Sequence, residues 1–345
     1  MLRNKKTILW LLLPILFASF AYRDQTMSIY RRTVWFIKGM REYTKSGYEA
    51  AAKNFKEEDL KVDCSGKSYM ITGSNSGIGK SMALEVAKRG GTVHLVCRNK
   101  TAAQEACDEI KTSTGNNNVH VHVLDVSKPR DVINFARSFN ENLDVLVNNA
   151  GCMVHTREVD ADGLERNFAT NVLGTFLLTK ALLTRLEQSS DPRVVTVSSG
   201  GMLNLKLDPE DPQCAKMNPF EGTMVYSQNK RGQVVMTEHL ARAHPAVHFS
   251  SMHPGWADTP AVRTSMPSFH NAMKNKLRSP EQGADTAVWL AISPAARKQP
   301  SGLFFQDRVA VSTHLPLAWT KSTPEEEKAF MQTLDDFWHK FNRSD

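Results

Sequence analysis

The chain has 345 residues, a formal net charge of +7, and 41% apolar and 23% charged residues, which predicts one large folded domain with extensions and excludes a disordered chain. Residues 1–60 hold eleven Lys/Arg against six Asp/Glu, whereas the remaining 285 residues hold 32 against 30. Because the basic excess is confined to the N-terminal end and no nucleic-acid motif follows it, we expect no nucleic-acid partner.

Residues 1–26 form a leader in which three basic residues precede an apolar stretch from Ile8 to Ala21. This order is typical of a signal peptide or a signal anchor. The stretch is shorter than the ~20 residues of a spanning helix, and Pro14 interrupts it. A buried leader helix is the alternative, and the sequence leaves open whether the segment is cleaved or anchors the protein.

Residues 27–63 form a second segment, a basic arm. Apolar side chains recur at roughly helical spacing from Met27 to Phe55, with arginines and lysines mostly between them, which predicts an amphipathic helix. Such a helix suits an anionic membrane surface, and packing against the main domain explains the pattern equally well. Six basic residues at 23–45, against three before the apolar run, favour a cytosolic main domain. We therefore expect association with the endoplasmic reticulum membrane, while secretion stays open.

The main domain, residues 64–345, begins with a strand expected at Ser68–Thr72, a glycine-rich turn and a helix that continues to about Arg89. These three elements are the start of a dinucleotide-binding unit, in which glycines let the backbone approach the pyrophosphate and the helix N-terminus faces the phosphates. The candidate cofactor-binding residues of the turn are Gly73, Ser74, Asn75, Ser76, Gly77, Ile78 and Gly79.

Two further strands are expected at Thr92–Cys97 and Val119–Leu124, each followed by a charged residue. Sites that prefer NAD usually carry an acidic residue after the second strand to hold the ribose hydroxyls. This chain has Arg98 there, and a guanidinium suits the 2′-phosphate of NADP, so we predict NADP(H) in preference to NAD. Asp125, after the third strand, is a candidate acceptor for the adenine amino group or a cap of the next helix.

The fourth and fifth strands, expected at Leu143–Val147 and Arg193–Ser199, precede the most reactive side chains. The fourth strand ends in the motif Asn148–Gly151. Tyr226 and Lys230 lie four residues apart, so they share one helix face. A lysine ammonium stabilises tyrosinate and lowers the phenol pKa from ~10 toward the operating pH, as a proton donor requires.

Together these residues resemble the short-chain dehydrogenase/reductase family over residues 64–310. The matching motifs are Thr72–Gly79 (TGxxxGxG), Asn148–Gly151 (NNAG), Tyr226–Lys230 (YxxxK), and Pro254-Gly255 followed by Thr259. The resemblance implies an α/β fold with a doubly wound, mostly parallel Rossmann-type sheet of six or seven strands and helices on both faces. It also implies an enzyme that transfers a hydride between nicotinamide and a carbonyl or alcohol.

The resemblance assigns roles to individual residues. Tyr226 is the acid-base group, Lys230 supports it and holds the nicotinamide ribose, and Ser199 stabilises the charge that develops on the substrate oxygen. Asn171 holds a water that links the lysine to solvent. Ser198 competes with Ser199 for the serine role, and the double-serine pattern of the family favours Ser199. The remaining implied cofactor contacts are Asn149, Ala150, Gly151, Pro254, Gly255 and Thr259.

Substrate and partners follow from the two longest irregular stretches, 200–224 and 257–280, which are expected to form the rim of the substrate pocket. The apolar residues of this rim favour a lipophilic carbonyl or alcohol of the retinoid, steroid or fatty aldehyde type. These residues are Met202, Leu203, Leu205, Leu207, Trp256, Met266 and Phe269. The alternative is a non-catalytic, membrane-attached NADP-binding sensor or scaffold.

Two further expectations concern assembly and metals. The family often pairs through helices that flank the tyrosine, so the resemblance allows a homodimer. His120 and His122 share one face of a strand, but no third ligand is evident in the sequence, so no metal site is predicted.

Overall fold

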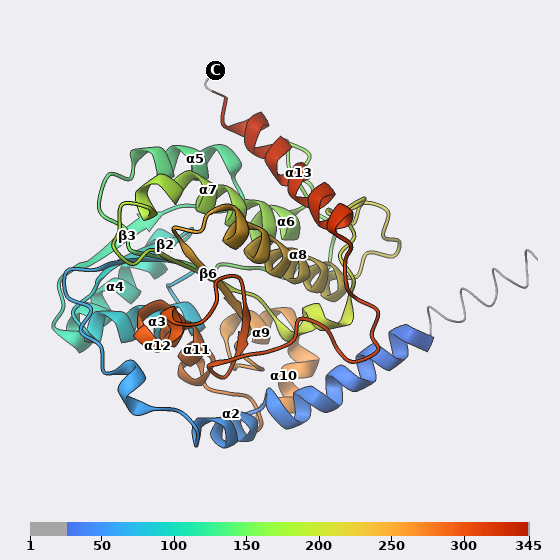
Figure 1. Ribbon diagram of the computed structural model, residues 1–345, viewed down its shortest axis with the longest axis horizontal. Helices are drawn as coiled ribbons and strands as arrows, with labels where there is room; N and C mark the ends of the chain where they lie inside the picture. Colours follow the sequence, from blue (N-terminus) through green and yellow to red (C-terminus); the bar gives the residue numbers. More distant parts are fainter. Residues whose placement is uncertain (1–25, 344–345) are drawn as a thin grey trace, which may run out of the picture.

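The computed structural model describes residues 26–343, and the leader predicted for residues 1–26 lies outside them apart from its last residue. A single sheet forms the centre of the described chain, in the order β3-β2-β1-β4-β5-β6-β7-β8 (Figure 1). Its strands are β1 (Ser68–Thr72), β2 (Thr92–Cys97), β3 (Val119–Val123), β4 (Val145–Asn148), β5 (Arg193–Val197), β6 (His248–Met252), β7 (Phe304–Gln306) and β8 (Val309–Ala310).

Every neighbouring pair of strands is parallel except β7 and β8, which are antiparallel. The doubly wound, mostly parallel sheet expected from the sequence is therefore confirmed. The eight strands exceed the predicted six or seven because the last one has only two residues. Asp307 and Arg308, both with positive φ, turn the chain back into it, and a strand this short leaves no alternating pattern in the sequence.

Two helical layers enclose the sheet (Figure 1). One apolar core includes residues of α3 (Gly77–Lys88), α4 (Lys100–Thr114), α11 (Pro280–Ile292) and α12 (Pro294–Arg297). The other includes residues of α5 (Pro129–Ser138), α7 (Gly174–Leu186), α8 (Gly222–Ala243) and α13 (Pro324–Phe341). Because both faces are covered, β1, β4, β5 and β6 are buried along their whole length, as parallel sheets require.

Several short helices occupy the connections after the central strands. They are α6 (Arg166–Phe168), the π-helical turn η2 (Ala169–Leu173), the 3-10 helix η3 (Gly200–Asn204), α9 (Pro260–Ser265) and α10 (Pro267–Met273). In a doubly wound sheet, ligands bind outside the carboxyl ends of the strands. The connections after β4, β5 and β6 therefore frame the expected site.

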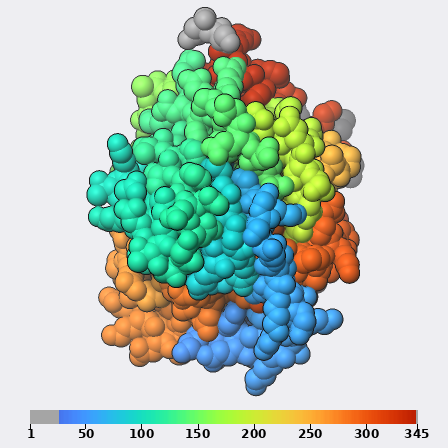
Figure 2. Space-filling view, turned by 90° about the vertical axis from the view of Figure 1, so that its left-hand side faces the viewer, coloured from blue at the N-terminus to red at the C-terminus, as the bar shows by residue number. Residues whose placement is uncertain are grey.

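The N-terminal arm packs along the main domain. Residues 26–42 are helical and are followed by α2 (Lys45–Ala52) and the short η1 (Glu57–Leu60). Tyr43 is fully buried, and Trp35 Nε1 donates to the Gly200 carbonyl oxygen at 2.8 Å. In the space-filling view the blue residues of the arm lie directly against the body (Figure 2). The inner face of the arm therefore fits the packed alternative, and none of the described helices has the length and apolarity to cross a membrane.

Candidate active site

The glycine turn between β1 and α3 has the form that a bound pyrophosphate requires. Gly73 and Gly77 have positive φ, 64° and 53°, a region that side chains disfavour. A Cβ on Gly79 would lie 2.4 Å from the Gly73 carbonyl oxygen, so only glycine fits there. Ser76 precedes α3 without a side-chain capping bond. The first amides of the helix therefore remain available to a phosphate, and the turn fits a nicotinamide dinucleotide.

Asn149 and Ser74 hold this turn from behind. Asn149 Nδ2 donates to the carbonyl oxygens of Thr72 at 2.9 Å and Gly73 at 3.2 Å. The backbone amides of Asn149 and Ala150 both donate to Thr72 Oγ1 at 2.9 Å. Ser74 is buried, and its hydroxyl donates to a carbonyl oxygen of β1 at 2.8 Å. The side chains of Asn149 and Ser74 are thus used to shape the turn. A bound cofactor would contact these two residues through their backbone atoms.

The far wall of the turn comes from the segment after β6. A Cβ on Gly77 would lie 3.3 Å from Thr259, and one on Gly283 would lie 3.2 Å from Ile78. Thr259 also caps α9, where its Oγ1 accepts from the Val262 amide at 3.3 Å. The structure thus brings Thr259, one of the implied cofactor contacts, to the glycine turn, with Asn75 half-buried within that turn.

Arg98 and Asp125, at the ends of β2 and β3, line a cleft of about 270 Å³ together with Ser127 and Lys128. Arg98 is exposed there. Asp125 Oδ1 accepts from the Ser127 amide at 3.0 Å and from the Ser127 hydroxyl at 2.7 Å. One carboxylate oxygen of Asp125 thus shapes the loop after β3. Arg98 and Asp125 together border the place where the adenosine half of a dinucleotide would lie.

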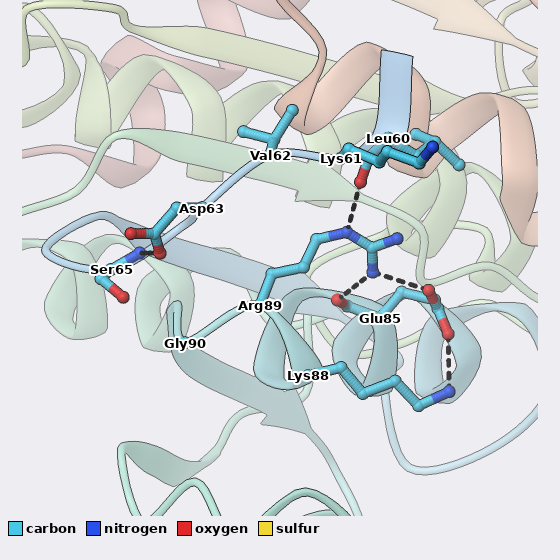
Figure 3. Close-up of a pocket in the computed structure, with 9 residues that line it drawn as sticks. All are labelled: Leu60, Lys61, Val62, Asp63, Ser65, Glu85, Lys88, Arg89 and Gly90. Carbon is cyan, nitrogen blue, oxygen red and sulfur yellow. Dashed lines mark hydrogen bonds and ion pairs between the residues drawn. The ribbon is translucent and has the colours of Figure 1, made fainter. Parts of the chain in front are cut away.

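A larger hollow of about 690 Å³ lies elsewhere, between the segment after η1 and the end of α3 (Figure 3). Its cations already have partners. Arg89 donates to the Leu60 carbonyl oxygen and to Glu85, and Lys88 pairs with Glu85 at 2.8 Å. This hollow contains none of the predicted site residues, and its self-paired charges give an anion little to bind.

The proposed acid-base pair lies on α8. Lys230 Nζ is 5.3 Å from the centre of the Tyr226 ring, and Tyr226 hydrogen-bonds Ser199. Ser199 Oγ also accepts from the Gly201 amide at 3.2 Å. Ser198 is turned away, and its hydroxyl donates to the backbone carbonyl of Lys230 at 2.8 Å. The fold therefore brings Ser199, the serine favoured from the sequence, to the tyrosine.

Burial dominates the electrostatics of this pair. It raises the pKa of Tyr226 to about 12, although the hydrogen bond with Ser199 acts in the opposite direction. It also lowers the pKa of Lys230 to about 7. Burial thus outweighs the lowering of the tyrosine pKa that the lysine was expected to cause. Lys230 Nζ donates to the Val197 carbonyl oxygen at 2.8 Å and to Gln233 Oε1 at 3.0 Å.

Asn171 lies in the π-helical turn η2, a feature frequent at functional sites. Its Nδ2 donates to the Cys152 carbonyl oxygen at 2.8 Å and to Asn229 Oδ1 at 3.1 Å, and its Oδ1 accepts from the Cys152 amide at 2.9 Å. A Cβ on Gly151 would lie 3.1 Å from Asn171 Oδ1 and 3.6 Å from Lys230 Nζ. The NNAG motif, Asn171 and the lysine therefore meet at one point.

Arg278 is a central residue that the sequence analysis missed. It is almost fully buried, pairs with Asp307 at 2.6 Å, and donates to the carbonyl oxygens of Glu42 at 2.6 Å and Pro254 at 3.3 Å. A Cβ on Gly255, whose φ is +72°, would lie 2.4 Å from Arg278 Nε. The Pro254-Gly255 loop is thus tied to the arm by a cation that lies within no motif.

The rim predicted for the substrate pocket is partly wrong. Met202, Leu203 and Leu207 are buried in the apolar cores. They pack inward because Arg231, itself buried, donates to the carbonyl oxygens of Met202 and Leu205 at 2.9 and 3.1 Å. Trp256 lies 5.2 Å from Phe269 between ring centres. Both rings are half-buried, and Trp256 also lies 5.7 Å from Trp35 of the arm between ring centres, so their contact with a substrate stays a prediction.

The histidines form a cluster that differs from the predicted pair. His94 Nδ1 lies 2.9 Å from His122 Nε2, and His94 Nε2 lies 3.0 Å from Ser68 Oγ. Burial lowers the pKa of His94 to about 3 and also lowers that of His122. His94 and Glu141 are nearby groups that could complete a metal set with His122, but both nitrogens of His94 already have hydrogen-bond partners.

Comparison with known proteins agrees with this geometry. The family model described as short chain dehydrogenase matches residues 67–268. The chain belongs to this family. This dehydrogenase is 57% identical over 317 residues to the dehydrogenase/reductase SDR family member 12 of Bos taurus and of Homo sapiens, which covers 91% of this chain and 100% of each relative.

Two more distant similarities extend the picture. The dehydrogenase is 36% identical over 241 residues to retinol dehydrogenase 11 of Homo sapiens, covering 67% of this chain and 74% of that relative. Among solved structures, a short chain dehydrogenase from Escherichia coli CFT073 in complex with NADPH superposes with a TM-score of 0.58 at 23% identity, covering 74% of this chain and all of that one. The latter shows a shared fold.

Proposed function

We propose that this dehydrogenase uses NADP(H) to interconvert a lipophilic carbonyl and its alcohol, with Tyr226 and Lys230 as the acid-base pair. The observation that carries the proposal is the convergence of Tyr226, Ser199 and Lys230 beside a glycine turn shaped for a dinucleotide. The 36% identity to a retinol dehydrogenase supports a lipophilic substrate.

In reduction, the substrate oxygen would be held by the hydroxyls of Ser199 and Tyr226. The bound nicotinamide supplies the hydride in reduction and accepts it in oxidation. Tyr226 gives its proton to the oxygen as negative charge develops there, and it regains a proton from solvent afterwards. Ser199 stabilises the developing charge, and the Lys230 ammonium stabilises the tyrosinate. In oxidation, tyrosinate removes the proton of the alcohol.

The catalytic role is tested with Tyr226→Phe, assayed against lipophilic aldehydes and ketones with NADPH. We expect the rate to fall by about 10²-fold or more, because general acid catalysis is lost, while NADPH affinity is retained. Wild-type protein that binds NADPH but turns over none of these substrates would favour the sensor or scaffold alternative.

Arg98 would set the preference for NADP(H), because it is exposed at the end of β2 and borders the adenosine cleft. Fluorescence titration of wild type and Arg98→Asp with NADPH and NADH tests this. We expect Arg98→Asp to weaken NADPH binding by about tenfold or more and to leave NADH binding unchanged or stronger, since a guanidinium–phosphate pair is lost. Equal losses for both nucleotides would contradict the assignment.

A membrane surface is the partner we propose for the outer side of the arm. Ile29, Phe36 and Ile37 on the arm and Leu317 and Trp319 on a C-terminal loop are between 48% and 77% exposed. Tyr30 and Arg31 fasten that loop to the arm by donating to the carbonyl oxygens of Pro316 and Ala318 at 2.9 and 2.6 Å. The exposed Arg32 and Arg41 lie on the same helix. Apolar and aromatic side chains beside arginines suit an anionic bilayer interface.

Co-sedimentation of the full chain with phosphatidylcholine vesicles, with and without phosphatidylserine, tests this surface. We expect Trp319→Ser to weaken binding by about tenfold, given the apolar area that a tryptophan would transfer. Val123→Ser, which removes an exposed apolar side chain from the edge strand β3, is the matched control and should bind as wild type. Equal binding of both variants would reject the proposed surface.

A further inference from the structure

The ammonium of Lys230 is buried and is held by neutral groups. Within the described chain its two hydrogen-bond acceptors are the Val197 carbonyl oxygen, at 2.8 Å, and Gln233 Oε1, at 3.0 Å. Lys230 is 2% exposed and Gln233 is fully buried. The amide of Gln233 thus supplies much of the solvation that water would otherwise give to this cation.

The other end of the same amide reaches the π-helical turn. Gln233 Nε2 donates to the Asn171 backbone carbonyl oxygen at 2.6 Å, and that oxygen also accepts from Thr175 Oγ1 at 3.0 Å. In the family resemblance, the Asn171 segment is expected to hold a water that leads from the lysine to solvent. In this chain the Gln233 side chain itself bridges the Asn171 carbonyl oxygen and the Lys230 ammonium.

The pairing depends on glutamine chemistry. Lys230 and Gln233 are three residues apart on α8, so they lie on one helix face. An amide offers an acceptor and a donor at its two ends, and both ends are used here. Methionine has a similar length but can satisfy neither partner. Glutamate keeps the acceptor, but in its ionised form it cannot donate to the Asn171 carbonyl.

We propose that Gln233 is the positioning residue for Lys230: it fixes the ammonium between β5 and the π-helical turn and replaces the expected relay water with an amide. Lys230 then acts on the tyrosine through its charge and position, because a side-chain amide does not pass protons along as a water chain does. The proton that Tyr226 regains comes instead from solvent at the substrate side, where the tyrosine is only half-buried. The inference rests on the proposed acid-base role of Lys230, and it adds a residue that none of the family motifs contains.

The test is the pH dependence of alcohol oxidation with NADP⁺ for wild type, Gln233→Met and Gln233→Glu. Without its amide acceptor, Lys230 loses charge more readily and stabilises tyrosinate less. For Gln233→Met we expect the pH of half-maximal rate to rise by about 1, and the rate near neutral pH to fall about tenfold, since a hydrogen bond to a charged group is worth roughly this much. For Gln233→Glu the negative charge of the carboxylate offsets the positive charge that Lys230 presents to the tyrosine. The pH of half-maximal rate should therefore also rise.

Gln228→Met is the matched control. Gln228 lies on the same helix and is also buried, but its amide faces Lys206 and Asp208. It should keep the wild-type pH profile. A uniform loss of rate at every pH in Gln233→Met and Gln233→Glu, with an unmoved profile, would reduce Gln233 to a structural role and overturn the proposal.

Two complications are separable from that outcome. If Gln233→Met fails to fold, judged by its melting temperature, the shift in Gln233→Glu alone decides the question. If the wild type shows no turnover, the proposed function fails instead. The ionisation of Tyr226, followed by tyrosinate absorbance as wild type minus Tyr226→Phe, then decides the Gln233 proposal by itself: a pKa that rises in Gln233→Met supports it, and an unchanged pKa rejects it.

Discussion

The cofactor side and the arm side of this molecule are built by different means. Around the glycine turn, short polar side chains from nearby motifs bond backbone groups, as in the 2.9 Å bonds that the amides of Asn149 and Ala150 donate to Thr72 Oγ1. On the arm side, side chains from segments more than 200 residues apart interlock. Trp35 and Phe36 lie 5.7 and 5.9 Å from Trp256 between ring centres, and Arg278 reaches back to Glu42.

This difference explains why the two sides differ in how much of them could be predicted. A backbone cradle needs glycines and small polar residues at fixed spacing, so it leaves a motif in the sequence. An interface of aromatic rings and ion pairs needs only large or charged side chains that come into contact after folding. Such side chains have no fixed spacing in the sequence, so they leave no motif. The arm side should accordingly depend on a few buried side chains, and three predictions test that contrast.

The largest effect is expected for Asp307→Asn, on the arm side. Asp307 is the carboxylate partner of Arg278, which is 1% exposed. Removing the negative charge leaves a buried cation uncompensated, which should lower the free energy of unfolding by about 3–5 kcal/mol. Urea denaturation measures the change. Asp258→Asn is the control, because its partner Arg263 is largely exposed and such pairs contribute about 0–1 kcal/mol. Equal losses in the two variants would mean that burial of the Arg278 pair does not matter.

The next effect concerns acid stability at the β2–β3 edge of the sheet, away from the arm. The folded chain keeps His94 neutral because burial lowers its pKa from 6.5 to about 3, whereas the unfolded chain protonates it near 6.5. The free energy of unfolding is therefore unaffected by His94 protonation above about pH 6.5, and it decreases as the pH falls from 6.5 toward 3. At pH 5 the loss is on the order of 2 kcal/mol.

Denaturation of wild type, His94→Gln and His155→Gln at several pH values measures this loss. His94→Gln should show a shallower decline of stability below pH 6.5, while the exposed His155 serves as a control that should decline as wild type does. Parallel curves for all three proteins would contradict the assignment of acid sensitivity to His94.

The smallest effect is expected for Gly39→Ala, which tests whether the arm side affects substrate binding without affecting cofactor binding. A Cβ on Gly39 would lie 2.4 Å from the Trp256 ring, so Gly39→Ala should push the arm from that ring at a cost of about 1–3 kcal/mol. We expect the KM for a lipophilic substrate to rise several-fold, while the Kd for NADPH stays at its wild-type value. Calorimetry and steady-state kinetics check both. A parallel loss of NADPH affinity would show that the arm also supports the cofactor side.

The catalytic residues are intermediate between the cofactor side and the arm side in how far the sequence predicts them. Tyr226, Lys230 and Ser199 follow from motifs in the sequence, and the structure brings them together at the end of β5. The state of the lysine does not follow from the motif. Its lowered pKa and its bonds to Val197 and Gln233 arise from burial and from the π-helical turn. The roles of these residues stay predictions until the variants are measured.

The sequence by itself determined the family, the doubly wound sheet and the glycine turn. Those features depend on local spacing: apolar runs long enough for buried strands, glycines where φ must be positive, and a tyrosine one helical turn before a lysine. Only the tertiary structure decided that Met202, Leu203 and Leu207 pack inward, that His94 pairs with His122, and that Arg278 and Gln233 hold the site. Each of these depends on which distant segment covers a side chain, and burial by distant segments leaves no periodicity in the chain that carries it.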